Sequence, residues 1–188
     1  MLVLACTAVT WYSEEKSLNL NERIGIMNAL RYERMTSDHD PNLPLLRSVY
    51  QTPEIARYLS ISNNFFHYVI HTADVYFYKV YDRQKLIGAI HLERQNEILY
   101  MSLLVFPAFQ RRGYGKSMLI DIQKDILGLD YQEIHVSVDE RNIASLNLFR
   151  NAGFHVISKE DELVNLAYAS DDHSAKNINN AGDHSWQS

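Results

Sequence analysis

The sequence predicts a single domain of the α/β (α+β) class, with a mixed, mostly antiparallel central sheet of about six or seven strands and about four helices. The chain has 188 residues, of which 46% are hydrophobic, and this is enough to bury one sizeable core. Residues 75–81 and 86–92 are rich in aromatic and β-branched side chains and flank a polar turn, as an antiparallel hairpin does. Elsewhere, apolar residues recur at helical spacing between further strand-like runs, so helices and strands alternate.

The predicted elements follow the order βαα-βββ-α-β-α-ββ. Thr52-Pro53-Glu54 supplies the second short helix with an N-cap, a first-turn proline and a first-turn acid. A longer helix starts beyond Gly113 and stops at Gly128, because glycine commonly ends helices. Residues 60–73 carry no recognised motif and are interpreted as a loop, although His67 and His71 stand four residues apart in a possible helix. The expected strands are residues 30–36, 75–81, 86–92, 97–105, 134–138, 154–158 and 163–168, and the expected helices are residues 45–50, 52–59, 113–128 and 143–152.

The two ends differ in composition from the middle of the chain. Residues 1–26 are expected to be an N-terminal appendage and residues 169–188 a disordered tail, which leaves residues 27–168 as the domain. The apolar run that ends at Thr10 is too short for a signal peptide or a membrane span, so we expect no membrane anchor. Alternatively, this run adds an edge strand or covers an apolar patch. The lone Cys6 cannot form an internal disulfide, which favours a cytoplasmic location.

The charge balance argues against nucleic acid as a partner. Eighteen Lys and Arg residues stand against 23 Asp and Glu residues, which gives a formal net charge of -5. A chain of this kind has no global basic field that would concentrate nucleic acid around it. Any anionic ligand must therefore be bound by a local arrangement of groups.

Residues 110–116 (QRRGYGK) lie between a predicted strand and a predicted helix. Glycines let backbone N–H groups turn toward an anion, and the helix dipole favours negative charge at that position. Two arginines and a lysine add contacts that suit a diphosphate. A basic surface turn without a ligand is the simplest alternative. A Walker phosphate loop is another, because Gly115-Lys116-Ser117 ends such a motif, although Gln110 stands where its first glycine belongs.

Two blocks of the sequence resemble one enzyme family. Residues 103–107 (LLVFP) and 110–115 (QRRGYG) resemble the hydrophobic-Val-x-Pro and Q/R-x-x-G-x-G/A signature of the GNAT acetyltransferases. Residues 142–145 (NIAS), with Leu148 and the Gly153-Phe154 pair, resemble the start and end of the helix that follows the family's fifth strand. The resemblance implies a GNAT-like fold in which the fourth and fifth strands splay apart, leaving a cleft for the pantetheine arm of acetyl-CoA.

The same resemblance implies where the co-substrate acetyl-CoA binds. Splayed strands leave backbone N–H and C=O groups unpaired, and these groups can hydrogen-bond an amide-containing arm as if it were another strand. The loop after the fourth strand is implied to hold the pyrophosphate. The residues implied for acetyl-CoA are Leu103, Leu104, Val105, Arg111, Arg112, Gly113, Tyr114, Gly115, Lys116, Asn142 and Ser145. For Asn142, a plain helix N-cap is an alternative role.

Acetyl transfer to an amine needs a neutral nucleophile, a polarised thioester carbonyl and a proton for the leaving thiolate. The resemblance implies a backbone N–H near Leu103 or Leu104 as the oxyanion donor, and a general-acid tyrosine at the position of Phe149. The carboxylate that the family often offers on its fourth strand is missing from residues 100–102. The catalytic candidates are therefore Glu93, His91 and Tyr100, with His135 as a weaker one. A hydrogen-bonded structural histidine and a solvated charge on the sheet are the alternatives for His91 and Glu93.

We therefore predict a cytoplasmic N-acetyltransferase that moves the acetyl group of acetyl-CoA to a primary amine of a small molecule or of a peptide or protein. The aromatic residues Phe65, Phe66 and Tyr68 suggest a mostly apolar amine pocket. His67 and His71 would bind a metal only with a third ligand, so no metal is expected, nor a nucleic acid or membrane partner. Whether the chain forms a homodimer is left open. The alternatives are an acetyl-CoA-binding sensor with weak catalysis and a P-loop-like nucleotide-binding protein.

Overall fold

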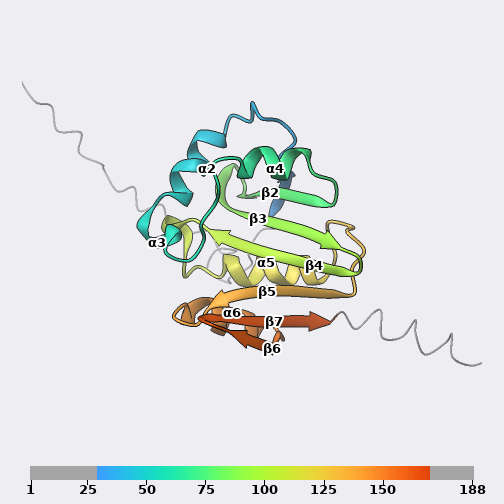
Figure 1. Cartoon of the computed structure of the whole chain (residues 1–188). Helices are drawn as coiled ribbons and strands as arrows, with labels where there is room; N and C mark the ends of the chain where they lie inside the picture. Colours follow the sequence, from blue (N-terminus) through green and yellow to red (C-terminus); the bar gives the residue numbers. More distant parts are fainter. Residues whose placement is uncertain (1–28, 170–188) are drawn as a thin grey trace, which may run out of the picture.

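The computed structural model describes residues 29–169, whose strands form one seven-stranded sheet in the order β1-β2-β3-β4-β5-β7-β6 (Figure 1). The strands are β1 (Arg31–Arg34), β2 (Val75–Asp82), β3 (Lys85–Gln95), β4 (Ile98–Val105), β5 (Glu133–Asp139), β6 (His155–Glu160) and β7 (Leu163–Ala169). The helices are α2 (Leu43–Tyr50), α3 (Pro53–Ala56), α4 (Phe65–His71), α5 (Tyr114–Gln123) and α6 (Ile143–Asn151), with the 3-10 turn η1 (Pro107–Phe109). The predicted class and the mixed, mostly antiparallel sheet are confirmed.

The helix α4 is the main departure from the predicted order of elements. The prediction of a loop over residues 60–73 is wrong, because α4 occupies the middle of that segment and raises the number of described α-helices from the expected four to five. This helix has only seven residues, and its buried side chains are Phe66 and Val69. Apolar residues therefore recur over less than two turns, which is too short for periodicity to identify a helix.

The predicted ends of the domain are only partly covered by the structure. Ala169, which was expected to begin the tail, is the last residue of β7 and pairs with Glu133 of β5. The predictions for residues 1–26 and for residues 170–188 lie outside the described residues. Within the described part, no helix is both long enough and apolar enough to cross a membrane.

The sheet opens between its fourth and fifth strands. All neighbouring strands are antiparallel except β4 and β5, which run parallel and pair at only three positions, the last of them Tyr100 with His135. In contrast, β3 pairs with β4 as far as Val105, and β7 pairs with β5 as far as Asp139. Figure 1 shows β4 and β5 side by side where they begin and diverging toward their arrowheads. The predicted splay between these strands is therefore confirmed.

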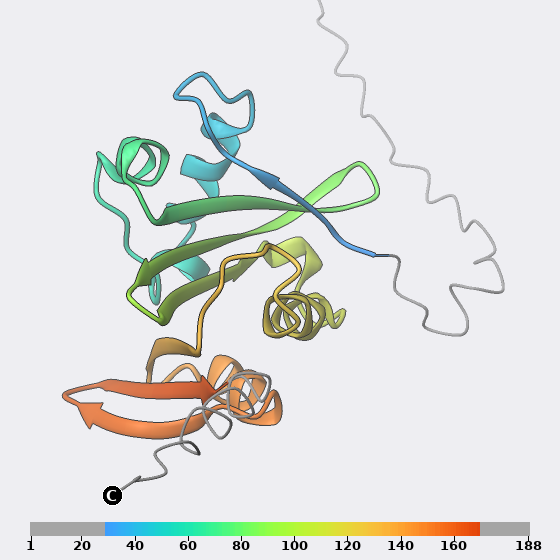
Figure 2. The ribbon, with the colours of Figure 1, turned by 90° about the vertical axis from the view of Figure 1, so that its right-hand side faces the viewer.

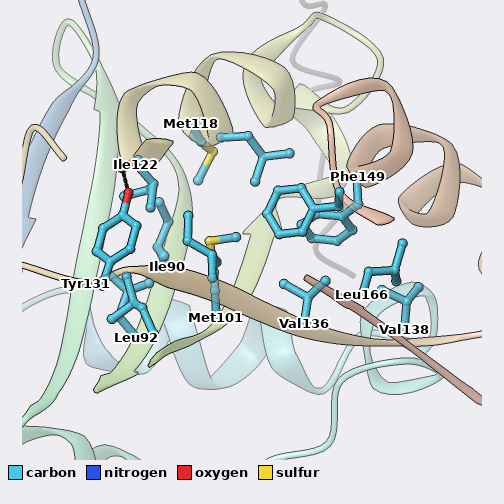
Figure 3. Close-up of a cluster of buried hydrophobic side chains, with 14 of the residues drawn as sticks. Ile90, Leu92, Met101, Met118, Ile122, Tyr131, Val136, Val138, Phe149 and Leu166 are labelled. Carbon is cyan, nitrogen blue, oxygen red and sulfur yellow. Dashed lines mark hydrogen bonds between the residues drawn. The ribbon is translucent and has the colours of Figure 1, made fainter. Parts of the chain in front are cut away.

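The two faces of the sheet are covered by different helices. On one face, α5 and α6 pack through Met118, Ile122 and Phe149 against all the central strands (Figure 3). Tyr131 closes this cluster, since its hydroxyl donates a hydrogen bond to the backbone carbonyl of Ile122. On the other face, α2, α3 and α4 cover a second cluster over the first strands of the sheet. Figure 2 shows the helices of the two layers on opposite sides of the strands.

The second layer also contains a buried charged group. Lys79 of β2 is 1% exposed, and its ammonium lies 2.5 Å from Glu33 Oε1 and 2.6 Å from Asp40 Oδ2. Burial disfavours the charged lysine, but the hydrogen bonds to Asp40 and Glu33 outweigh burial and raise the pKa of Lys79. Asp40 belongs to the loop between β1 and α2, so this ion pair attaches that loop to the sheet.

Removing the Lys79 charge should therefore destabilise the domain. Lys79→Met leaves the mostly buried Asp40 carboxylate without its cation, and we expect the free energy of unfolding to fall by about 3 kcal/mol. The matched control is Lys159→Met, because Lys159 pairs with Glu140 at an exposed site and should contribute less than about 1 kcal/mol. Urea denaturation measures both values. Equal losses in the two variants would contradict this account of Lys79.

Candidate active site

The parting of β4 and β5 leaves two strand edges that face each other without a sheet partner between them. Among the described residues, the β4 edge from 101 to 105 is paired on its β3 side only, and the β5 edge from 136 to 139 on its β7 side only. Leu104 is buried against the second layer, whereas Leu103 and Val105 pack against the α5 and α6 layer. These three residues therefore offer a ligand mainly their backbone groups, as the sequence predicted for an arm that binds like a strand.

Residues 110–116, between η1 and the first turn of α5, have the backbone conformation and charge of an anion-binding loop, and we call them the anion-holding loop. Arg111 and Gly113 both have left-handed backbone conformations, with φ of 61° and 85°, and Gly113 is the N-cap of α5. Successive N–H groups in such a conformation converge on one point, and those of the first helical turn have no acceptor within the helix. The side chains of Arg111, Arg112 and Lys116 are exposed around this point. The loop therefore combines backbone donors, a helix dipole and positive charge.

Two residues of this loop also fix its position in the fold. The Tyr114 hydroxyl donates a 2.6 Å hydrogen bond to Asp82 Oδ2, which attaches the start of α5 to the end of β2. Gly115 lies against α6, where an added Cβ would be 3.1 Å from Leu148 Cδ2. A glycine at position 115 thus lets α5 and α6 approach closely beside the splayed strands.

The start of α6 lies directly after β5. Asn142 is the N-cap of this helix, and its Oδ1 accepts a hydrogen bond of 3.2 Å from the Ser145 N–H. The capping role considered for Asn142 is therefore present in the structure. Phe149, at the position where the resemblance implied a tyrosine, is buried with its ring centroid 5.2 Å from that of Phe154. Position 149 has no hydroxyl and contributes to the core instead.

The three predicted catalytic candidates lie together on the face opposite α5 and α6. His91 and Glu93 project from one face of β3, and the register places Tyr100 of β4 directly opposite Glu93. Tyr100 is in turn the last partner of His135 across the β4 and β5 boundary, with ring centroids 5.6 Å apart. A pocket of about 170 Å³ opens here, lined by His91, Glu93, Tyr100, Met101, Ser102, His135 and Ser137.

The helix α4 covers the β3 side of this pocket. The Tyr68 hydroxyl donates a 3.0 Å hydrogen bond to Glu93 Oε2, and Gln95 donates one of 2.8 Å to Oε1. The Phe65 ring contacts His91 edge to face at 5.3 Å. Phe65 and Tyr68, two of the three aromatic residues expected near an amine pocket, therefore lie beside this pocket. Phe66 does not, because it is buried in the core of the second layer.

His91 is the buried titratable group of this pocket. Its Nε2 atom is buried and has no hydrogen-bond partner among the described residues. Burial lowers the pKa of His91, and the nearby Glu93 charge opposes this effect only in part. The imidazole is therefore neutral near pH 7, and one of its ring nitrogens is buried beside the pocket without a hydrogen-bond partner in the described part of the chain.

A second pocket, of about 220 Å³, adjoins the first one across Tyr100 and His135. It is lined by Tyr100, His135, Val136, Ser137, Ile157, Ser158, Asn165 and Leu166. Ser102, Ser137 and Asn165 line these pockets but were not among the site residues predicted from the sequence. Period-two alternation from His135 would have identified Ser137 as a residue on the same face of β5. Asn165 lies beside Ser137 only because β7 pairs with β5, which the sequence does not show.

Comparisons with known proteins agree with this geometry. The model of the Acetyltransferase (GNAT) family matches residues 32–154. The uncharacterised N-acetyltransferase YfmK of Bacillus subtilis is 30% identical over 82 residues, which are 44% of this chain and 55% of that protein. The chain therefore spans about half the length of this curated relative.

Solved structures share the fold at low sequence identity. Spermidine N-acetyltransferase from Vibrio cholerae, in complex with CoA and spermine, has a TM-score of 0.63 at 16% identity, over 75% of this chain and 95% of that one. Campylobacter jejuni N-acetyltransferase PseH, in complex with acetyl coenzyme A, has a TM-score of 0.61 at 14% identity, over 75% and 99%. An aminoglycoside N(6')-acetyltransferase from Legionella pneumophila has a TM-score of 0.63 at 14% identity, over 78% and 95%. Because the family model matches well over half of its length, this chain belongs to the GNAT acetyltransferase family.

Proposed function

We propose that this chain is an N-acetyltransferase that transfers the acetyl group of acetyl-CoA to a primary amine of a small molecule or of a peptide or protein. One observation carries the proposal: the unpaired edge of β4 connects the anion-holding loop at one end with the polar pocket beside His91 at the other. Acetyl-CoA matches this arrangement, because its amide-containing arm has a diphosphate at one end and a thioester at the other. The CoA and acetyl-CoA complexes of the Vibrio and Campylobacter proteins support it.

The diphosphate of acetyl-CoA is proposed to bind the backbone of residues 111–116 and the side chains of Arg111, Arg112 and Lys116. The pantetheine amides then hydrogen-bond the free edge of β4, next to Leu103, Leu104 and Val105. Asn142 and Ser145 line the opposite wall at the start of α6, where Asn142 keeps its capping hydrogen bond.

In the proposed reaction, the amine nitrogen attacks the thioester carbonyl, the C–N bond forms and the C–S bond breaks. His91 accepts the amine proton through a water or after a rotation of its ring, because its imidazole is neutral and its buried Nε2 has no partner in the described residues. The Glu93 carboxylate attracts the amine and stabilises the imidazolium that forms. A backbone N–H of the β4 edge near Leu103 or Leu104 stabilises the oxyanion. The leaving thiolate takes its proton from the Tyr100 hydroxyl or from water.

A second candidate function is an acetyl-CoA-binding sensor with little catalysis. Phe149 is the observation that favours it, because a buried phenylalanine cannot protonate the leaving thiolate. The argument against a sensor is that a well-positioned amine can attack the thioester while solvent carries the protons. The P-loop-like alternative has no support, because the loop belongs to the matched GNAT segment.

Amine-dependent release of CoA distinguishes the enzyme from the sensor. We expect a thiol assay to detect CoA on addition of at least one amine from a panel of a polyamine, an aminoglycoside and peptides with free N-termini. The control is acetyl-CoA with protein and no amine. Binding of acetyl-CoA without CoA release across the whole panel would favour the sensor.

The role of His91 can be tested through the pH profile. Protonation of His91 removes the base, and since its pKa lies below the usual value of about 6.5, kcat/KM should fall only below that pH. His91→Gln should lower kcat/KM at neutral pH by roughly a hundredfold and abolish this acid limb. His155→Gln, on the exposed strand β6, is the control and should keep both. An unchanged acid limb in His91→Gln would assign the base elsewhere.

The anion-holding loop can be tested with a matched pair of substitutions. Gly113→Asp and Gly113→Asn place side chains of similar size at an exposed residue with positive φ, where both Asp and Asn are tolerated. Only Asp adds a negative charge against the diphosphate. We expect Gly113→Asp to bind CoA about tenfold more weakly than Gly113→Asn in isothermal titration. Equal affinities in two folded variants would refute the loop assignment.

A further inference from the structure

A cluster of two histidines and one aspartate lies outside the proposed active site. His67 and His71 stand four residues apart on α4, so they project from the same face of that helix. These two histidines would bind a metal only together with a third ligand. The structure supplies it from the loop between β1 and α2, where Asp38 lies against both rings.

The distances in this cluster suit one small divalent ion. Asp38 Oδ2 lies 2.7 Å from His71 Nε2, and Asp38 Oδ1 lies 3.6 Å from His67 Nδ1. One ligand atom from each of the three residues can be chosen so that all lie within 4.8 Å of one another. Tetrahedral zinc with bonds of about 2.0–2.1 Å keeps its ligand atoms about 3.4 Å apart, a separation between the 2.7 Å and 3.6 Å distances of this cluster.

The chemistry of the donors selects the type of ion. Two imidazoles and one carboxylate suit Zn²⁺ and related transition ions, whereas Mg²⁺ and Ca²⁺ prefer oxygen ligands only. Tyr68 follows His67 at the position where a zinc hydrolase carries its glutamate, and its hydroxyl bonds Glu93 instead. The cluster therefore has no adjacent general base for activating a water.

We propose that Asp38, His67 and His71 form a structural binding site for Zn²⁺, with water completing the coordination. The ion links the loop before α2 to α4. This link would stabilise α4, because the helix has only seven residues and the side chain of its N-cap Asn64 makes no capping hydrogen bond. The loop is already attached to the sheet through Asp40 and Lys79, so the site would tie α4 to a fixed point.

Isothermal titration of the full chain with ZnCl₂, after treatment with a chelator, tests the proposal. We expect His67→Gln, His71→Gln and Asp38→Asn each to weaken one zinc site by about tenfold or more, and the double His variant to lose that site. His155→Gln is the control and should titrate like the original chain. All three ligands are exposed, so the variants should stay folded.

A second measurement locates the bound ion. Hydrogen exchange of residues 65–71 should slow when Zn²⁺ is added to the original chain, and should not respond in the double variant His67→Gln with His71→Gln. Absence of zinc binding, or binding that these substitutions leave unchanged, would overturn the proposal. The second outcome would place the ion at other residues of the chain.

Discussion

The parting of two parallel strands is the constraint on which the rest of the site depends. β4 and β5 pair only as far as Tyr100 and His135, after which each continues with a partner on its outer side alone. The backbone N–H and C=O groups along these inner edges have no strand partner, so they can hydrogen-bond water or a ligand. An extended ligand with amide groups can therefore bind between the two strands as another strand would.

The two faces of the sheet provide different environments at this opening. The α5 and α6 layer is packed with apolar side chains, and Gly115 against Leu148 brings its two helices together next to the free edge of β4. The opposite face is polar where β3, β4 and β5 meet, because no helix of the second layer extends its apolar cluster there. A ligand arm and an acceptor can therefore approach the same strands from different environments.

The short helix α4 joins several features of the polar face. It places Tyr68 on Glu93 and Phe65 on His91, and its outer side carries His67 and His71 next to Asp38. Such a short helix has little stability of its own, so its position depends on these contacts.

The sequence by itself determined the order of most elements and the family, because alternation, capping residues and glycine spacing are local signals. It also placed His91 and Glu93 on one face of a strand, since side-chain direction there follows from period two alone. Only the tertiary structure decided that Asn165 of β7 lies near Tyr100 and that Asp38 meets α4, because those contacts depend on strand order and loop path. The tertiary structure also decided that residues 65–71 form the helix α4. Its seven residues are held in place by packing, and the local sequence pattern alone is too short to predict this.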